Sequence, residues 1–143
     1  MTAPLRSSTS GWLGVASANH VQRGVTLSIA QINHGQRAGL ARMHPGDTLI
    51  YYSSTQVMGV QDGYQHFTAL GTIHDSDIWQ ADEGDFRPYR RRVEYLPTKP
   101  APLAELRSRL NLTRVPNWGY QLRRGLVPLD AEDVAVIREA MQL

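Results

Sequence analysis

The 143-residue sequence contains no cysteine, which excludes disulfide bonds and thiolate metal sites. No apolar run approaches the roughly 20 residues that a membrane-spanning helix requires, so we expect no membrane segment. Residues 1–10 hold few sizeable apolar side chains and lack the apolar centre of a secretory signal peptide. We therefore expect a cytoplasmic protein in which residues 1–10 form a disordered tail and residues 11–143 form a single domain.

The sequence motifs of several enzyme classes are also missing. The five histidines show neither i, i+4 pairing nor a His-Glu-x-x-His pattern, so we predict no bound metal. There is no Gly-x-Ser-x-Gly elbow for a nucleophile, and there is no glycine-rich dinucleotide loop or Walker loop. We therefore expect no catalytic residue of these kinds and no cofactor.

Lysine is almost absent, because fourteen of the fifteen basic residues are arginine and only Lys99 is lysine. Arginine binds phosphate through two donors at once and stacks on bases, so an arginine-rich surface suits nucleic acid. A GC-rich genome would produce the same bias without a functional cause. Four arginines cluster within residues 87–92, whereas acidic residues gather within residues 75–85. This placement predicts one basic and one acidic face.

Apolar runs and period-two alternation predict four strands, over residues 12–17, 49–53, 67–73 and 89–96. Helices are predicted over 18–24, capped by Asn19 and ended by Gly24, over 102–110, and after Asp130, which serves as an N-cap. Segment 75–85 is predicted to be an acidic loop, and 115–122 a fifth strand or a loop. Strands separated by short helices in a chain of this size predict an α+β domain whose sheet curls into a barrel.

The stretch from Gln31 to Ser53 joins a polar loop to a buried strand. Within it, Pro45 presets its own backbone angle, Gly46 accepts a positive φ, and Asp47 can accept hydrogen bonds from nearby amides, so the chain reverses there. Upstream, residues 33–37 place hydrogen-bonding side chains beside a flexible glycine. Such a loop at the end of a strand is suited to line a pocket.

Residues 86–91, Phe-Arg-Pro-Tyr-Arg-Arg, place two aromatic rings beside three guanidinium groups. Base stacking combined with phosphate binding requires those groups. The alternative interpretation is a core-facing Tyr89 with solvated arginines. Alternation along the strand also places Tyr89 and Arg90 on opposite faces, so both can face one site only if a bulge separates them.

A series of segments in fixed order carries a family resemblance: Trp12-Leu13-Gly14-Val15-Ala16-Ser17, His34-Gly35-Gln36-Arg37-Ala38, Met43-x-Pro45-Gly46-Asp47, Ile50-Tyr51-Tyr52-Ser53, Phe67-Thr68-Ala69-Leu70-Gly71, Pro88-Tyr89-Arg90-Arg91-x-Val93 and Trp118-Gly119. Together they resemble the EVE domain family, a branch of the PUA-like fold related to the YTH and ASCH domains. The resemblance implies an α+β, PUA-like pseudo-barrel of about five to six strands with flanking short helices.

The resemblance also implies a non-enzymatic module that binds DNA or RNA and reads one modified base flipped into a pocket. Methylated or hydroxymethylated cytosine and methyladenine are the expected bases. The residues implied for the base pocket are Ser17, Gln31, Asn33, His34, Tyr52, Ser53, Phe86, Tyr89 and Trp118. Those implied for phosphate are Arg37, Arg90 and Arg91.

Two other functions stay open at this point. One is a small amidohydrolase acting on a modified nucleoside, as in some ASCH relatives, which would need a lysine and an acid converging in the pocket. The other is an RNA-binding accessory domain without preference for modification. We expect a monomer with no membrane partner, and a protein effector such as a nuclease is compatible with a domain that only reads bases.

Overall fold

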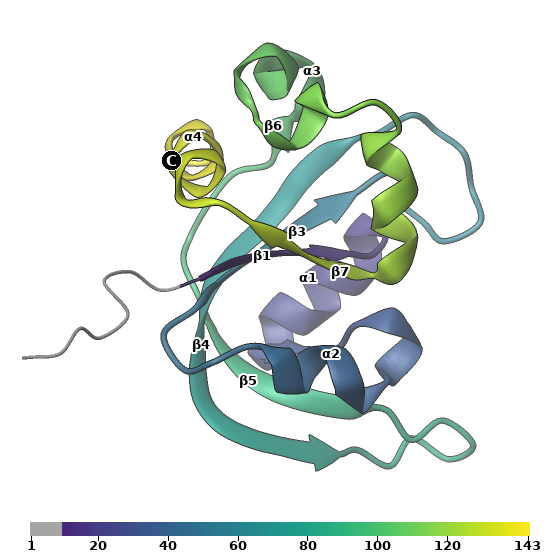
Figure 1. Cartoon of the computed structure of the whole chain (residues 1–143). Coiled ribbons are helices and arrows are strands. Elements are labelled where there is room, and N and C mark those ends of the chain that lie inside the picture. The colour runs from purple at the N-terminus through teal and green to yellow at the C-terminus, as the bar shows by residue number, and fades with distance from the viewer. Residues whose placement is uncertain (1–9) are drawn as a thin grey trace, which may run out of the picture.

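One curled sheet organises the fold. The computed structural model describes residues 10–143, so the predicted tail over residues 1–10 lies outside the described part except for Ser10. Seven strands pair in the order β2-β5-β4-β3-β1-β7, and β6 pairs with β4 outside this path (Figure 1). The strands are β1 Gly11–Val15, β2 Ile29–Ala30, β3 Thr48–Ser53, β4 His66–Gln80, β5 Tyr89–Tyr95, β6 Ala101–Pro102 and β7 Leu126–Leu129.

The sheet is mixed and open. β1 and β3 are parallel, and the remaining pairs are antiparallel. Within residues 10–143 the two end strands, β2 and β7, do not pair with each other, so the sheet remains open along the line between them, which we call the seam. The predicted α+β fold with flanking short helices is confirmed, with seven strands in place of five or six.

Short helices cover both faces of the sheet. The α-helices are α1 Ala18–Leu27, α2 Arg37–Arg42, α3 Leu103–Leu106 and α4 Ala131–Ala140. The 3-10 helices are η1 Asn33–Gly35, η2 Arg107–Arg109, η3 Leu112–Arg114 and η4 Trp118–Arg124. α1 and α2 lie on one side of the sheet, and α3 and α4 lie on the other (Figure 1). Within the described residues, no helix is both long enough and apolar enough to cross a membrane.

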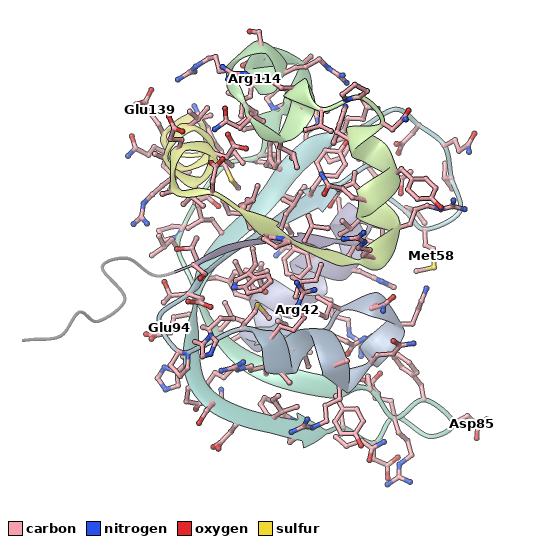
Figure 2. All side chains as sticks on the ribbon, viewed as in Figure 1. Arg42, Met58, Asp85, Glu94, Arg114 and Glu139 are labelled. Atoms are coloured by element: carbon pink, nitrogen blue, oxygen red, sulfur yellow. The ribbon has the colours of Figure 1, made fainter. Side chains whose placement is uncertain are left out.

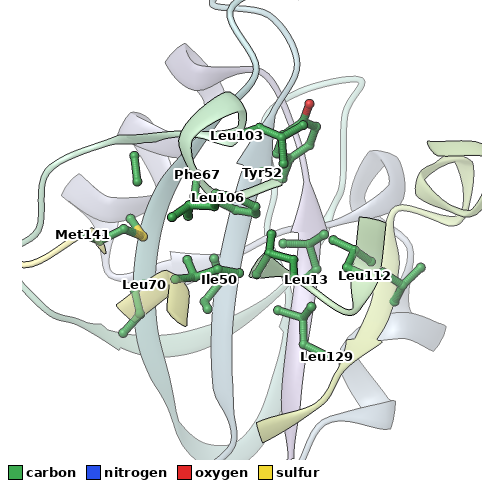
Figure 3. Close-up of a cluster of buried hydrophobic side chains, with 14 residues drawn as sticks. Leu13, Ile50, Tyr52, Phe67, Leu70, Leu103, Leu106, Leu112, Leu129 and Met141 are labelled. Atoms are coloured by element: carbon green, nitrogen blue, oxygen red, sulfur yellow. The ribbon is translucent and has the colours of Figure 1, made fainter. Parts of the chain in front are cut away.

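The sheet separates two hydrophobic clusters because side chains alternate along each strand. Tyr52, Phe67 and Leu70 belong to the cluster beneath α3 and α4 (Figure 3). Tyr51 belongs to the second cluster, beneath α1 and α2. A register shift opposite Tyr51 and Tyr52 leaves Thr68 unpaired and moves Phe67 to the side of Leu70. Neighbouring tyrosines on β3 therefore serve opposite sides of the molecule.

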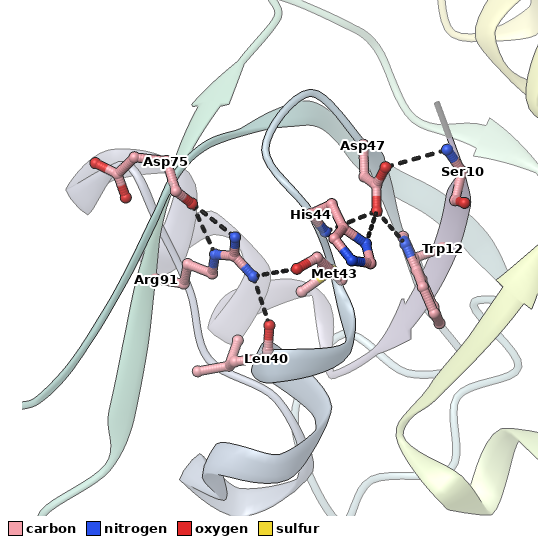
Figure 4. Close-up of polar contacts among 8 residues, drawn as sticks. All are labelled: Ser10, Trp12, Leu40, Met43, His44, Asp47, Asp75 and Arg91. Carbon is pink, nitrogen blue, oxygen red and sulfur yellow. Dashed lines mark hydrogen bonds and ion pairs between the residues drawn. The ribbon is translucent and has the colours of Figure 1, made fainter. Parts of the chain in front are cut away.

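The predicted turn before β3 is confirmed. Gly46 has a φ of 90°, and the buried Asp47 carboxylate accepts from the amide of His44 at 2.8 Å, from the amide of Ser10 at 3.1 Å and from Trp12 Nε1 at 2.9 Å (Figure 4). Asp47 therefore ties the start of β1 to the start of β3.

The first helix differs from its prediction at both ends. Ser17, and not Asn19, is the N-cap residue, and the helix continues past Gly24 to Leu27, where Ser28 adopts a left-handed conformation with φ 58°. Gly24 is needed for close approach, because a Cβ there would lie 3.0 Å from the Ile29 carbonyl oxygen. The glycine packs the helix against β2 instead of ending it.

Two later segments also differ from prediction. Residues 75–80 belong to β4, because a bulge between Ile73 and Ile78 restores pairing with β5, and only residues 81–88 form the turn. Residues 118–124 form η4, and Leu126–Leu129, which include Pro128, form the strand β7, which was not predicted. Proline fits there because β7 lies at the edge of the sheet. The predicted N-cap of α4 is confirmed, since Asp130 accepts from the Asp133 amide at 2.8 Å.

Candidate functional site

A pocket of about 420 Å³ lies at the seam of the sheet. Ile29 of β2 borders it on one side, and Gly125, directly before β7, borders it on the other. The remaining walls come from α1, the end of β1, β3, β5, η4, the loop 54–65 and the turn 81–88. They also include the loop over residues 31–36 that contains η1, which we call the η1 loop. The volume lies in the roughly 300–1,000 Å³ range of small-molecule sites. The open seam of the curled sheet thus provides the cavity.

The inner wall is apolar. Val15 and Ala16 from the end of β1 and Val21 from α1 line it together with the ring of Tyr51. The Tyr51 hydroxyl donates to the Gln31 carbonyl at 3.3 Å, and burial raises the pKa of Tyr51 far above its ordinary value, with the hydrogen bond to Gln31 opposing that shift. Tyr51 therefore stays neutral and fixes the η1 loop to the sheet.

The η1 loop supplies the polar wall. Asn33 (φ 48°), His34 (φ 60°) and Gly35 (φ 82°) are all left-handed, a conformation that is unfavourable for the first two. Gly35 allows the loop to pack closely against the turn 81–88, because a Cβ there would lie 2.5 Å from Pro88 Cβ. Left-handed residues held by surrounding packing are typical of functional loops.

Two pocket-lining residues of the loop each keep one side-chain hydrogen-bonding atom free. Gln31 Oε1 accepts from Arg90 Nε at 3.0 Å, and Asn33 Nδ2 donates to Gln36 Oε1 at 3.0 Å. Among residues 10–143, the Gln31 amide nitrogen and the Asn33 amide oxygen have no hydrogen-bond partner. One donor and one acceptor are thus free to meet the edge of a polar ligand.

Two guanidinium groups meet at the mouth of the pocket. Arg90 Nη2 and Arg23 Nη2 each lie 2.6 Å from Glu83 Oε2. The Arg90 side chain is 13% exposed, whereas the Arg23 side chain is 61% exposed. The hydrogen bond from Arg90 and the charges of both arginines lower the pKa of Glu83, so its carboxylate is ionised at neutral pH. The protein's own carboxylate therefore occupies a cationic site.

The structure brings five of the predicted residues to this pocket: Gln31, Asn33, His34, Phe86 and Arg90. Ser17 lies beside it, next to Ala16, but its hydroxyl donates to Asn19 Oδ1 at 2.7 Å. Arg37 is exposed on α2 and does not line the pocket. Tyr89 packs against the hydrophobic cluster beneath α1 and α2, so Arg90 is the member of that pair that reaches the pocket.

Three predicted pocket residues lie elsewhere. Tyr52 points to the opposite side of the sheet, with its ring 5.5 Å from Phe67 and 6.4 Å from Trp118. The hydroxyl of the buried Ser53 pairs with Thr68 Oγ1 at 2.8 Å. The prediction chose the wrong one of two adjacent tyrosines, because alternation on β3 turns Tyr51 toward the pocket and Tyr52 away from it.

The assignment of Arg91 to phosphate is also wrong. Arg91 is 2% exposed, and its guanidinium donates to the main-chain carbonyls of Leu40, Met43 and Asp75 (Figure 4). A phosphate cannot reach a group that is buried and already bonded on several sides. Arg91 holds α2 and the β4 bulge against β5.

Several pocket residues were missed in the sequence, namely His20, Arg23, Tyr51, Met58 and Arg123. His20, Arg23 and Leu27 share one face of α1 through their i, i+3 and i+7 spacing, which was a usable signal. Met58 projects from the 54–65 loop at the edge of the molecule (Figure 2). Arg123 lies just outside the segment 115–122 that was predicted as a strand or loop, so no face was assigned to its side chain.

Metal binding has no candidate site in the described part of the chain, since residues 10–143 contain no group of three or more His, Asp or Glu side chains placed to hold an ion. The pocket wall itself carries cations from Arg23, Arg90 and Arg123. Its electrostatics therefore favour an anionic ligand over a metal ion.

Comparisons with known proteins agree with this architecture. The EVE domain matches residues 10–140. A UPF0310 protein of Renibacterium salmoninarum is 47% identical over 130 residues, covering 91% of this chain and 94% of the relative. A UPF0310 protein of Mesorhizobium japonicum is 44% identical over 134 residues, covering 91% of this chain and 90% of the relative.

Solved structures show the same fold at low sequence identity. A hypothetical protein from Leishmania major superposes with a TM-score of 0.61 at 15% identity, covering 94% of this chain and 96% of that one. The crystal structure of a protein from Pseudomonas putida superposes with a TM-score of 0.57 at 18% identity, covering 91% of this chain and 98% of that one. With its family match over nearly the whole length, the chain belongs to the EVE domain family.

Proposed function

We propose that this domain binds nucleic acid and holds one extruded, modified base in the seam pocket without chemically changing it. The observation that carries the proposal is a single cavity that joins an apolar wall, a free amide donor and acceptor, and a pair of guanidinium groups at its mouth. An extruded nucleotide has a flat apolar ring, a polar edge and a phosphate. Each part has a matching surface.

The base would enter with its edge toward the η1 loop. Gln31 and Asn33 can pair with the exocyclic and ring nitrogens, and His34 adds a group that can donate or accept. Val15, Ala16 and Val21 give the apolar surface that a methyl substituent on the base would contact. Phe86, which is 43% exposed at the rim, offers a ring for stacking.

The phosphate would take the position now held by the Glu83 carboxylate. Arg90 and Arg23 already converge on one oxygen there, so the cations are in place before the ligand arrives. Charge-assisted hydrogen bonds to phosphate would replace those to the carboxylate. Binding should weaken with added salt, because phosphate contacts release counterions.

Turnover has less support than binding. An amidohydrolase needs a lysine and an acid converging on the substrate, but Lys99 does not line the pocket, and its amide donates to the Met141 carbonyl at 2.9 Å. The carboxylate at the mouth, that of Glu83, is bonded to two arginines, which lowers its basicity.

We expect the protein to bind single-stranded oligonucleotides with one modified base at least about tenfold more tightly than the unmodified strand, as for a buried base edge worth roughly 1–3 kcal/mol. The panel comprises 5-methylcytosine, 5-hydroxymethylcytosine and N6-methyladenine in DNA and RNA, measured by fluorescence anisotropy. The free modified nucleosides are titrated by calorimetry.

Three results would contradict the proposal. Equal affinity for modified and unmodified RNA would identify an accessory RNA-binding domain without preference for modification. Release of cytidine from N4-acetylcytidine by the purified protein would identify the amidohydrolase. A domain that binds no strand of the panel would also refute the proposal.

Glu83→Gln should tighten oligonucleotide binding by about fivefold at low salt, because the two guanidinium groups lose a competing anion and gain the ligand phosphate. Asp85→Asn is the matched control. It removes the same charge at the tip of the same turn (Figure 2), and in the described structure Asp85 contacts neither arginine. If both variants tighten binding equally, general electrostatics and not the mouth of the pocket explains the change.

A further inference from the structure

A second basic segment of the chain reaches the pocket. Between Glu105 and Asp130 the sequence contains no acidic residue but has five arginines: Arg107, Arg109, Arg114, Arg123 and Arg124. η4 lies in the middle of this segment and reaches the seam, because Leu122 and Arg123 line the pocket. A polyanion bound at the pocket would therefore meet positive charge as it leaves along η4.

An exposed aromatic ring lies within this segment. Tyr120 is 69% exposed, and the Arg123 Cζ atom lies 5.1 Å from its ring centroid. Trp118, by contrast, packs into the cluster beneath α3 and α4 with the Arg107 Cζ atom 5.5 Å from its ring. Trp118 therefore serves the core, whereas the Tyr120 ring is open to a ligand.

The ring stands at the rim of a second concavity. This hollow, of about 850 Å³, is lined only by residues within 115–124, including Tyr120 and Arg124. Apart from its chain neighbours, a Cβ on Gly119 would meet nothing within 4 Å, so the chain is open to solvent at the residue before Tyr120. Arg123 lines the first pocket and lies over the ring of Tyr120, which itself lines the second hollow.

We propose that Tyr120, with Arg123 and Arg124, forms a subsite that stacks the unpaired base of the nucleotide next to the one in the seam pocket. An exposed tyrosine beside arginines gives the two components of single-strand binding, an aromatic face for any base and cations for the backbone. The subsite rests on the proposed function, and it makes the ligand a single strand, because a paired neighbour cannot stack on the ring.

The test uses three probes: a free modified nucleoside, a single-stranded pentamer with that base at its centre, and the same pentamer with abasic neighbours. Tyr120→Ala should weaken binding of the ordinary pentamer about tenfold, since one base stack is lost. It should leave the nucleoside and the abasic pentamer unchanged. Tyr120→Phe keeps the ring and should bind like the wild type. Because Tyr120 is exposed, the thermal midpoint of unfolding should not change.

The outcomes separate this inference from the proposed function. If the wild type binds the modified nucleoside but Tyr120→Ala binds the pentamer as tightly as the wild type, the proposed subsite at Tyr120 is refuted and the proposed role of the seam pocket is retained. If the wild type binds neither nucleoside nor pentamer, the proposed function fails and the subsite fails with it. Tighter binding of the wild type to the fully paired duplex of the same sequence would also overturn the subsite.

Discussion

Arg91→Met is expected to lower the free energy of unfolding by about 3–5 kcal/mol, as when one partner of a buried charged network is removed. Arg91 Nη1 donates to the carbonyls of Leu40 at 2.7 Å and Met43 at 2.6 Å. Nε and Nη2 donate to the Asp75 carbonyl at 2.9 and 2.7 Å. Methionine would fill the space and leave these carbonyls without their donors.

Three elements depend on this one side chain. Leu40 belongs to α2, Met43 follows that helix directly, and Asp75 lies in the β4 bulge. Burial lowers the pKa of Arg91, while the carboxylates of Asp75 and Asp47 raise it, so the guanidinium is held in place at an electrostatic cost. The planar fork of arginine meets several carbonyls at once, which an ammonium group cannot do.

Denaturant unfolding followed by circular dichroism measures the effect. The free energy of unfolding of Arg91→Lys should lie between those of the wild type and Arg91→Met, because lysine keeps the charge but loses part of the arginine's set of donors. Arg92→Met is the matched control, since Arg92 is exposed on the same strand, and it should change stability by less than about 0.5 kcal/mol. If Arg91→Met lowers the free energy of unfolding by less than about 1 kcal/mol, water must replace the guanidinium as the donor to these carbonyls.

The predictable parts of this fold have local causes. The turn through Gly46 and Asp47 and the cap at Asp130 each depend on side chains within a few residues, and the structure has both. Strand alternation likewise placed β1, β3 and β5 within one or two residues of their bounds. The family resemblance extended this to the whole α+β fold.

The parts that could not be predicted have causes far along the chain. Arg90 and Arg91 are adjacent and chemically identical, and only the carbonyls of α2 and β4, remote in sequence, decide that one is buried and the other lines a pocket. The length of β4 depends on a bulge matched to β5. Bulges shift side-chain parity without a strong sequence signal.

Arg90→Met should weaken binding of a modified oligonucleotide about 30-fold, or about 2 kcal/mol, the value of a charge-assisted hydrogen bond in a partly buried site. Arg90 acts twice in the pocket. Its Nε donates to Gln31 Oε1 at 3.0 Å, which leaves the Gln31 nitrogen free for the proposed base, and its Nη2 carries a charge at the mouth. Methionine keeps the length of the side chain and removes both functions.

Arg87→Met is the control that separates this role from overall charge. Arg87 is exposed in the turn 81–88, and its guanidinium has no partner within residues 10–143, so it contributes to binding only through the long-range field. We expect Arg87→Met to lower the affinity for the modified oligonucleotide by less than about threefold, and raising the salt concentration should abolish this difference.

The salt dependence of the Arg90 variant decides how the pocket works. The Gln31 contact does not involve phosphate, so part of the 30-fold loss should persist at high salt, and it should persist for the free nucleoside, which has no phosphate. If the loss disappears at high salt and for the nucleoside, Arg90 only attracts the backbone. If Arg90→Met and Arg87→Met weaken binding equally, the seam pocket is not the binding site.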